Sequence, residues 1–342
     1  MRKKTVLAGR TAMILLLAFA AMILISSGEQ MGMDGQAALF VGRNYTADLQ
    51  RRMTDMNDNI NQKIFDIPKV YTLPLDQSPS PLPDPEGFTE DTYEDQTISV
   101  KCWRERIDFP KKTVTANFAE ITVAHPSQIR TAFAGGSFSS KRSLGSKIAR
   151  LNNAVVAVNG DFYNYRKTGV IIRNGMLFRE VPNNADVLFI DSDGNFSIKN
   201  DFDAVQEGYY KQKKMLQALS FGPSLVNNGE ILSKIDRVYS ICGPYGQEPR
   251  SAVGQLGPLH YLICTVDGRS DKSRGVTVHE LAGIMKDKNC SVAYNLDGGQ
   301  STVLYFHDRL FNRVSDGGER ALSDILYFAT ALPEADRLSD AG

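Results

Sequence analysis

The segment SVAYNLDGGQST, residues 291–302, holds the residue types best suited to chemistry in this chain. An apolar run ends in polar side chains, and two glycines and two hydroxyl residues follow directly. Glycines let a backbone approach a ligand closely, and neighbouring N–H and hydroxyl groups can hold an anion. A carboxylate beside such an anion site suits acid–base work on a phosphorylated sugar. The ordinary alternative is a strand whose end is capped by Asp297. The residues concerned are Asn295, Asp297, Gly298, Gly299, Ser301 and Thr302.

Two further apolar runs end in the same way. AVVAVNGDF carries Asn159 and Asp161, and LICTVDGR carries Asp267 and Arg269. The segment PRSAVG places Arg250 at the start of another strand, and arginine binds two phosphate oxygens at once. A single Asp-Gly pair is an ordinary turn signal, but three such strand ends beside arginines predict one shared rim.

Strands must carry this rim. Four continuous apolar runs, of the length expected for central strands covered on both faces, occupy 154–159, 259–266, 291–296 and 324–332. Tight antiparallel hairpins are predicted where Asn or Asp precedes Gly between β-type residues, because these pairs supply positive φ angles. Those turns are Asn174-Gly175, Asp193-Gly194 and Asn228-Gly229.

Helices are few. Thr277 and Glu280 form a capping box ahead of an apolar stretch, and a second helix is expected from Ser143 to Leu151. The predicted fold class is therefore α+β, with mixed, largely antiparallel sheets and a few covering helices.

The N-terminal region has a different character. Basic residues precede an uncharged apolar run at 12–25, which predicts a signal peptide or signal anchor over 1–28 and export across the membrane. Apolar residues at three- and four-residue steps predict an amphipathic helix over 44–65, within a stalk at 29–67. Prolines and acidic residues predict an extended linker at 68–95, followed by a catalytic domain at 96–332 and a tail at 333–342.

Composition narrows the function. Lys+Arg and Asp+Glu both number 39, and this balance argues against a nucleic-acid binder, which usually carries a basic excess. The histidines lack the spacing of metal ligands. The four cysteines could form up to two disulfides or remain buried free thiols; they are Cys102, Cys242, Cys264 and Cys290.

Several motifs occur in one order that is more specific than any of them alone: NGDF, GPSLVNNG, PRSAVG, VDGR, GVTVHELA, NLDGGQST and GERALSD, between residues 159 and 324. Together they resemble the phosphodiester glycosidase family, of the mannose-6-phosphate uncovering-enzyme type. The resemblance covers roughly residues 100–332. It implies a hydrolase that removes a sugar such as N-acetylglucosamine from a sugar-1-phosphate diester, without a cofactor.

The resemblance also implies roles for individual residues. Catalytic roles fall on Asp297, Asp267, Asp161 and Glu280, although the capping box explains Glu280 equally well. Gln300 stands where many relatives have glycine, and Asp161 stands where some relatives have a second glycine. The expected substrate- and phosphate-binding residues are Arg250, Arg269, Asn159, Asn295, Gly298, Gly299, Ser301, Thr302 and Arg320.

Two other functions compete with a glycosidase. A metal-dependent phosphodiesterase could hold Ca²⁺ or Mg²⁺ through the oxygens of Asp161, Asp267, Asn295 and Asp297, although no metal site is indicated. A cell-surface glycan-binding module would instead need aromatic grooves. The expected partners are a phosphorylated glycan (teichoic-type, capsular, exopolysaccharide or phosphoglycan) and, through an uncleaved N-terminal segment, a membrane. The expected location is secreted or anchored to the outer face of the cytoplasmic membrane.

Overall fold

The computed structural model describes residues 51, 70–75, 79–232, 235 and 245–333. The predicted signal segment, the stalk helix over 44–65 and nearly all of the tail lie outside the described residues. Within the described residues, no helix is both long and apolar enough to cross a membrane.

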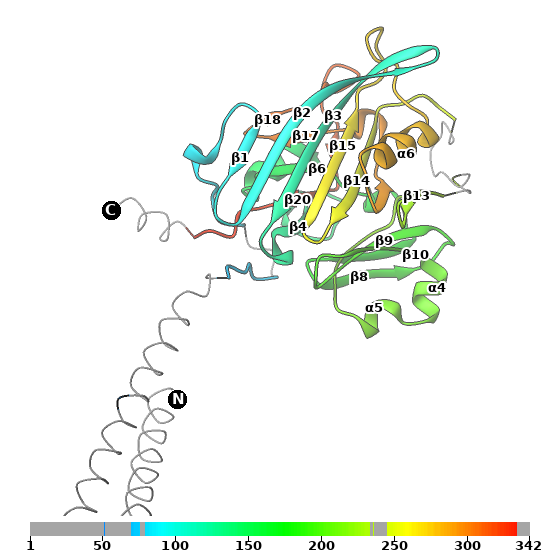
Figure 1. Cartoon of the computed structure of the whole chain (residues 1–342). Helices are drawn as coiled ribbons and strands as arrows, with labels where there is room; N and C mark the ends of the chain where they lie inside the picture. The colour runs from blue at the N-terminus through cyan, green and yellow to red at the C-terminus, as the bar shows by residue number, and fades with distance from the viewer. Residues whose placement is uncertain (1–50, 52–69, 76–78, 233–234, 236–244, 334–342) are drawn as a thin grey trace, which may run out of the picture. The chain divides into compact units, whose positions relative to one another are not determined.

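An antiparallel eight-stranded sheet forms the largest layer (Figure 1). Its long hairpin pairs two twelve-residue strands in unbroken register, from Ile98 with Val123 to Phe109 with Lys112. The strands in order are β1 (Thr92–Glu94), β2 (Ile98–Phe109), β3 (Lys112–Val123), β15 (His260–Val266), β14 (Arg250–Gly257), β16 (Val292–Asn295), β12 (Ser224–Asn227) and β13 (Glu230–Ile231).

Two five-stranded antiparallel sheets and a short strand pair complete the β-structure. One five-stranded sheet contains β10 (Phe196–Asn200), β9 (Asp186–Asp191), β11 (Met215–Leu219), β7 (Gly169–Arg173) and β8 (Met176–Val181). The other contains β18 (Arg309–Leu310), β17 (Leu304–Phe306), β6 (Val156–Asn159), β20 (Asp324–Phe328) and β4 (Ile129–Phe133). The short pair is β19 (Ala321–Leu322) with β5 (Ser143–Leu144).

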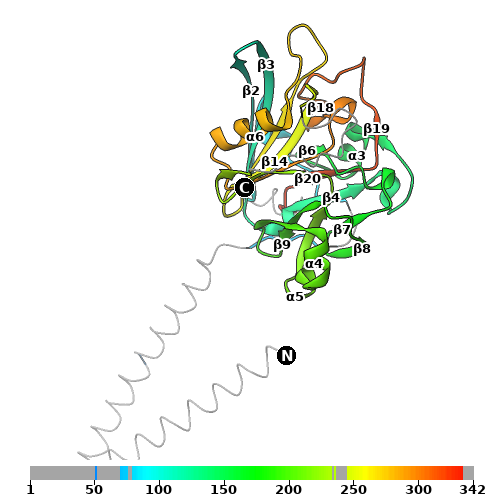
Figure 2. The same ribbon diagram turned by 90° about the vertical axis from the view of Figure 1, so that its right-hand side faces the viewer.

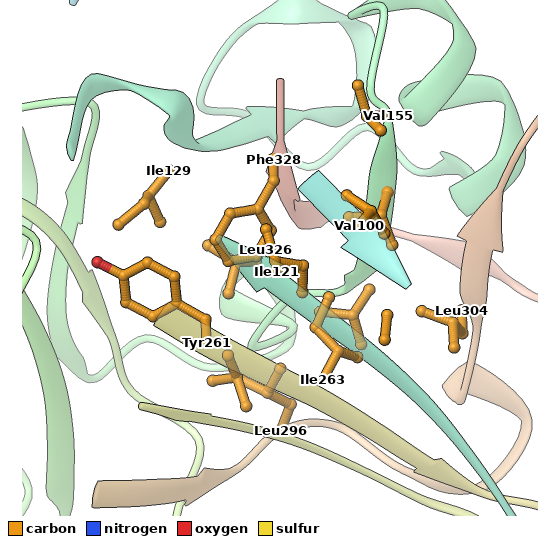
Figure 3. Close-up of a cluster of buried hydrophobic side chains, with 14 of the residues drawn as sticks. Val100, Ile121, Ile129, Val155, Tyr261, Ile263, Leu296, Leu304, Leu326 and Phe328 are labelled. Carbon is orange, nitrogen blue, oxygen red and sulfur yellow. The ribbon is translucent and has the colours of Figure 1, made fainter. Parts of the chain in front are cut away.

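The main core lies where the three large sheets meet. Side chains of the eight-stranded sheet such as Ile121 and Ile263 pack against Leu326 and Phe328 of β20 (Figure 3). Strand residues alternate between faces. Val253 of β14 therefore points into this core, whereas its neighbour Ala252 belongs to a second core on the opposite face.

Helices cover the outer faces. α6 (Val278–Asp287) closes the second core of the eight-stranded sheet, and α4 (Asp201–Gln206) and α5 (Tyr209–Gln212) lie against the β7–β11 sheet (Figure 1). α3 (Gly145–Leu151) covers the sheet that contains β6 and β20 (Figure 2). Short 3₁₀ turns occur at η1 (Pro85–Gly87), η2 (Pro126–Gln128), η3 (Ala134–Gly136), η4 (Tyr163–Tyr165) and η5 (Gly299–Ser301).

These elements confirm the predicted class of largely antiparallel sheets with few helices. All three predicted turns join antiparallel neighbours. Asn174-Gly175 and Asn228-Gly229 have positive φ at both residues, as a two-residue hairpin requires, whereas the connection at Asp193-Gly194 is longer. The capping box of Thr277 and Glu280 is present at the start of α6.

The predicted linker at 68–95 needs correction. β1 pairs with β2, Tyr93 is fully buried, and Leu73 and Ser80 are also buried. The folded unit therefore begins well before residue 96. Prolines favour extended backbone, but they do not prevent such a segment from packing along a surface.

The described cysteines are buried free thiols: Cys102, Cys264 and Cys290. Burial raises the pKa of all three, that of Cys290 to about 12, so the thiols are held in their neutral form. Cys242 lies outside the described residues. No disulfide therefore joins the three described cysteines to one another.

Candidate functional site

The strand ends that carry the predicted motifs do meet. At the start of β14, Arg250 pairs with Val266 at the end of β15, and Ala252 pairs with Asn295 at the end of β16. The end of β6 reaches the same place through Asn159. Its Nδ2 donates to the carbonyl oxygen of Asp297 at 2.7 Å, and its Oδ1 accepts a hydrogen bond from Ser251 Oγ at 2.7 Å. Asn159 thus ties the rim together rather than facing a ligand.

The segment after β16 contains buried polar atoms without partners. Asp297 Oδ1 accepts a hydrogen bond from the N–H of Gly298 at 2.9 Å, whereas its Oδ2 accepts none from any described residue. Asn295 Oδ1, Ser301 Oγ and Thr302 Oγ1 are likewise buried without a hydrogen-bond partner among the described residues. Buried polar groups are normally paired. Four unpaired atoms within eight residues indicate a place where a ligand supplies the missing partners.

Two glycines shape this segment. A Cβ on Gly298 would lie 2.8 Å from the carbonyl oxygen of Pro249, closer than real Cβ atoms approach. Gly299 has φ of +62°, and its Cβ would lie 3.0 Å from a guanidinium nitrogen of Arg269. The turn therefore needs glycine at both positions to pass between β14 and Arg269.

Electrostatics single out Asp297. Burial raises the pKa of its carboxyl, and Ser301, Arg320, the Gly298 N–H and Arg166 oppose that rise. The Ser301 hydroxyl is close enough to lower the pKa, although its Oγ meets hydrogen-bond geometry with no described residue. A carboxyl with a raised pKa is suited to exchanging protons near neutral pH.

Two arginines, Arg320 and Arg166, are near enough to Asp297 for their charges to lower its pKa. Arg320, which the sequence predicted, lies over the ring of Phe162 at 4.9 Å and forms no ion pair with a described residue. Arg166, which the sequence analysis missed, lies over Phe221 at 4.7 Å and donates to the Ser220 carbonyl oxygen at 3.2 Å. Its position four residues after the NGDF motif was the available signal.

Asp267 forms a second carboxylate centre. Its Oδ1 accepts hydrogen bonds from Asn117 Nδ2 at 2.8 Å and from the N–H of Arg313 at 3.3 Å, and burial raises its pKa. Asn312, which directly precedes Arg313 in the chain, donates a hydrogen bond to the carbonyl oxygen of Thr302 at 3.0 Å. Asp267 is thus connected to the unpaired cluster through one short segment.

Asp161 is not placed as a catalytic acid. Its Oδ1 accepts from Arg173 Nη2 and its Oδ2 from the N–H of Ser220, both at 2.8 Å. Arg173 also donates to Asp324 at 2.7 Å, and all three side chains are almost fully buried. A carboxylate with both oxygens occupied and its charge paired has a structural role.

Glu280 and Arg250 are also corrected. Glu280 accepts a hydrogen bond from the N–H of Thr277 and forms an ion pair with Lys112, both at 2.7 Å. These contacts confirm its role in the helix cap and do not support a catalytic role. The guanidinium of Arg250 donates to the backbone carbonyl oxygens of Val276 and Gly246, both at 2.8 Å. Arg250 therefore fixes the loops beside the rim instead of facing it.

Arg269 lies at the rim, in a positive-φ conformation (φ +54°). Its guanidinium pairs with Glu248 at 2.8 Å and also with Asp316. Two carboxylates thus hold it against Gly299. A phosphate would have to compete with these acids for the guanidinium of Arg269, whereas Arg320 forms no ion pair with a described residue.

No cluster of three or more His, Cys, Asp or Glu side chains with metal-binding geometry occurs in the part of the chain that the structure describes. Asp161, one of the four oxygen ligands considered for Ca²⁺ or Mg²⁺, is bound to Arg173. Asp267 and Asp297 likewise belong to no such cluster among the described residues.

Comparison with solved structures places the fold. The catalytic domain of zebrafish N-acetylglucosamine-1-phosphodiester alpha-N-acetylglucosaminidase, auto-inhibited by its pro-peptide, superposes with a TM-score of 0.58 at 21% identity, over 69% of this chain and 85% of that one. A hypothetical protein from Synechocystis gives a TM-score of 0.52 at 13% identity, over 68% of this chain and 62% of that one. These likenesses show a shared fold.

Sequence comparison adds a bacterial relative and a family. The SPbeta prophage-derived uncharacterized protein YomE of Bacillus subtilis (strain 168) is 27% identical over 185 residues, which are 52% of this chain and 28% of that protein. The chain therefore spans little more than a quarter of that relative. A family model described as phosphodiester glycosidase matches residues 152–329, a little over half of the chain and the whole of the segment from β6 to β20. The chain belongs to the phosphodiester glycosidase family.

Proposed function

We propose that this protein hydrolyses sugar-1-phosphate diesters, releasing the sugar from the phosphate. The observation that carries the proposal is the cluster of unpaired buried atoms on Asn295, Asp297, Ser301 and Thr302, which lies beside Arg320 in a member of this family. Hydroxyl and amide groups can bind sugar hydroxyls and phosphate oxygens, and Arg320 supplies the positive charge that a phosphate diester needs.

The reaction we propose breaks the bond between the anomeric carbon and the phosphate oxygen. Water adds its oxygen to the anomeric carbon and loses a proton, while the phosphomonoester leaves with the bonding electron pair. Asp297 stabilises the positive charge that develops at the anomeric carbon and takes part in the proton transfer. Asp267 is the second carboxylate, held in place by Asn117. Phosphate is a good leaving group, so this route needs little help from a general acid.

Hydrolysis in ¹⁸O-labelled water tests the bond that is cleaved. The purified chain is incubated with synthetic alkyl sugar-1-phosphate diesters, starting with N-acetylglucosamine. We expect the label on the anomeric hydroxyl of the sugar and an unlabelled phosphomonoester. Label in the phosphate, together with loss of activity on chelation, would show a metal-dependent phosphodiesterase instead.

We also propose that the reaction takes place outside the cytoplasm, on a cell-surface or extracellular glycan. The support is the sequence of residues 1–28, in which Arg2, Lys3, Lys4 and Arg10 precede the apolar run. Protease treatment of intact cells should digest the catalytic domain while a cytoplasmic marker protein survives. Complete protection of the domain would contradict export.

A further inference from the structure

A cavity of about 720 Å³ lies between η3 and α3. Its charged lining residues are Lys141, Arg142 and Lys147, and no aspartate or glutamate lines it. Gly135 and Gly136 form part of the wall, both with positive φ. A Cβ on Gly135 would lie 2.8 Å from the Lys141 side chain, whereas one on Gly136 would meet nothing within 4 Å. A side chain on Gly135 would therefore displace that of Lys141 in the cavity wall.

No acidic side chain balances the three cations within the cavity. The chain as a whole carries equal numbers of basic and acidic residues, and some of its other lysines pair with carboxylates, as Lys199 does with Glu207 and Lys286 with Glu230. None of the three cavity cations forms an ion pair with a described residue. Three like charges around one cavity repel one another unless an anion lies between them.

Hydrogen bonds link the loop that lines the cavity to a segment that contacts Arg320. Asn164 donates to the carbonyl oxygens of Ser140 and Lys141, at 3.4 and 3.3 Å, and Tyr163 donates to that of Ser139 at 2.9 Å. The preceding residue, Phe162, lies beneath Arg320, whose charge acts on Asp297. One continuous segment, residues 162–164, therefore connects the loop of the basic cavity to Arg320 of the candidate site.

We infer that this cavity is a subsite for a second anionic group of the substrate, a phosphate one repeat away from the diester that is cleaved. The inference rests on the proposed function and narrows it. The substrate is then a polyanionic glycan with repeating phosphodiesters, and a diester with a single phosphate fills only half of the binding surface.

The test compares a triple variant with a control that has the same change in net charge. The variant is Lys141→Gln, Arg142→Gln, Lys147→Gln, and the control is Lys199→Gln, Lys211→Gln, Lys286→Gln, whose lysines are exposed and lie elsewhere. Both are measured on a phosphodiester-linked glycan oligomer and on a one-phosphate diester. We expect the cavity variant to lose about tenfold in kcat/KM on the oligomer and less than about twofold on the short diester. The control should match the wild type on both substrates.

Binding is measured separately, so that a failure of the hydrolysis proposal does not decide the subsite. In calorimetry at low salt, the cavity variant should bind the oligomer about tenfold more weakly than the control variant does. Equal binding by the two variants would overturn the inference whether or not any diester is hydrolysed. It would also be overturned if the cavity substitutions abolished binding to vesicles containing anionic lipid while oligomer binding stayed unchanged.

Discussion

Two buried polar clusters lie side by side in this protein and differ in how their atoms are paired. In the first, Arg173 donates to both Asp161 and Asp324, and also to the backbone carbonyl oxygens of Ile172 and Ala218. In the second, around Asp297, four buried atoms have no hydrogen-bond partner among the described residues. The two clusters meet at Gly160, whose N–H donates to the Asp324 carbonyl oxygen and whose own carbonyl lies 3.5 Å from the N–H of Asp297.

The difference separates a structural role from a functional one. A buried charge is tolerated when a partner neutralises it, and removing one partner leaves the other uncompensated. A buried polar atom without a partner destabilises the fold unless something outside the chain binds it. The paired cluster therefore supports the strand ends, and the unpaired cluster beside it is available to a substrate.

Breaking the paired cluster should have the largest effect. Arg173→Met leaves Asp161 and Asp324 buried without their cation, so we expect a loss of about 3–5 kcal/mol in the free energy of unfolding. Denaturant unfolding measures this loss. Lys199→Met, which removes an exposed ion pair, is the control and should leave the free energy of unfolding close to that of the wild type. If Arg173→Met changed the free energy of unfolding as little as Lys199→Met does, the buried ion pairs would contribute little to stability.

Replacing Asp297 should lower activity without lowering stability, the opposite of what we expect for Arg173. Asp297→Asn keeps the shape but removes the charge, so kcat/KM should fall by about 100- to 1,000-fold. Because burial raises the pKa of this carboxyl, the fold disfavours its charged form, and the variant should be as stable as the wild type or more so at neutral pH. Asp287→Asn, an exposed carboxylate on α6, is the matched control. Loss of stability with unchanged activity in Asp297→Asn would reverse the assignment.

The paired cluster should also make stability depend on pH. Two carboxylates share one arginine, and burial raises the pKa of Asp324 from 3.8 to about 7. A raised folded pKa means that this group contributes stability fully below pH 3.8 and loses it as the pH rises toward 7, by at most about 1.4 kcal/mol per pH unit. Unfolding midpoints measured from pH 4 to 8 should show this decline, and Asp324→Asn should flatten it. An unchanged slope in the variant would assign the dependence to other groups.

The smallest effect is expected at Glu280. Glutamine retains the capping box, so Glu280→Gln removes only the charge that faces Lys112. We expect kcat/KM within about twofold of the wild type, and a loss of up to about 1 kcal/mol in stability. A large fall in activity at full stability would return Glu280 to the catalytic residues.

In this chain, the sequence predicts local structure better than it predicts which distant side chains form hydrogen bonds and ion pairs. Asn174-Gly175 specifies a hairpin and Thr277 a helix start, because the determining residues are neighbours in the chain. The burial of Arg173 is different, since its partner Asp324 lies 151 residues away. NGDF and NLDGGQST place Asp161 and Asp297 in similar motifs, and only tertiary contacts show that one is paired and the other is not.

The predicted rim followed from the alternation of apolar runs and polar ends, and the sheet register brings those ends together. The same reasoning predicts that Arg250 and Arg269 are free to bind phosphate, but in the structure both guanidinium groups have protein partners. Composition does not reveal that Arg250 donates to backbone carbonyls or that Arg269 is held by two acids. The prolines and acidic residues of 68–95 predict a linker, whereas the structure has strand β1 near the end of this segment, paired with β2.

The two ends of the folded unit lie next to each other. Thr72, Leu73 and Pro74 line the same cavity as Ala331 and Pro333, and Leu73 shares a buried cluster with Ala329 and Ala331. A short peptide could therefore join the ends, and the chain could be opened at the exposed turn of Asn228 and Gly229 without moving the sheets. The folded unit is thus a natural candidate for circular permutation, and for insertion as a unit into a surface loop of another protein.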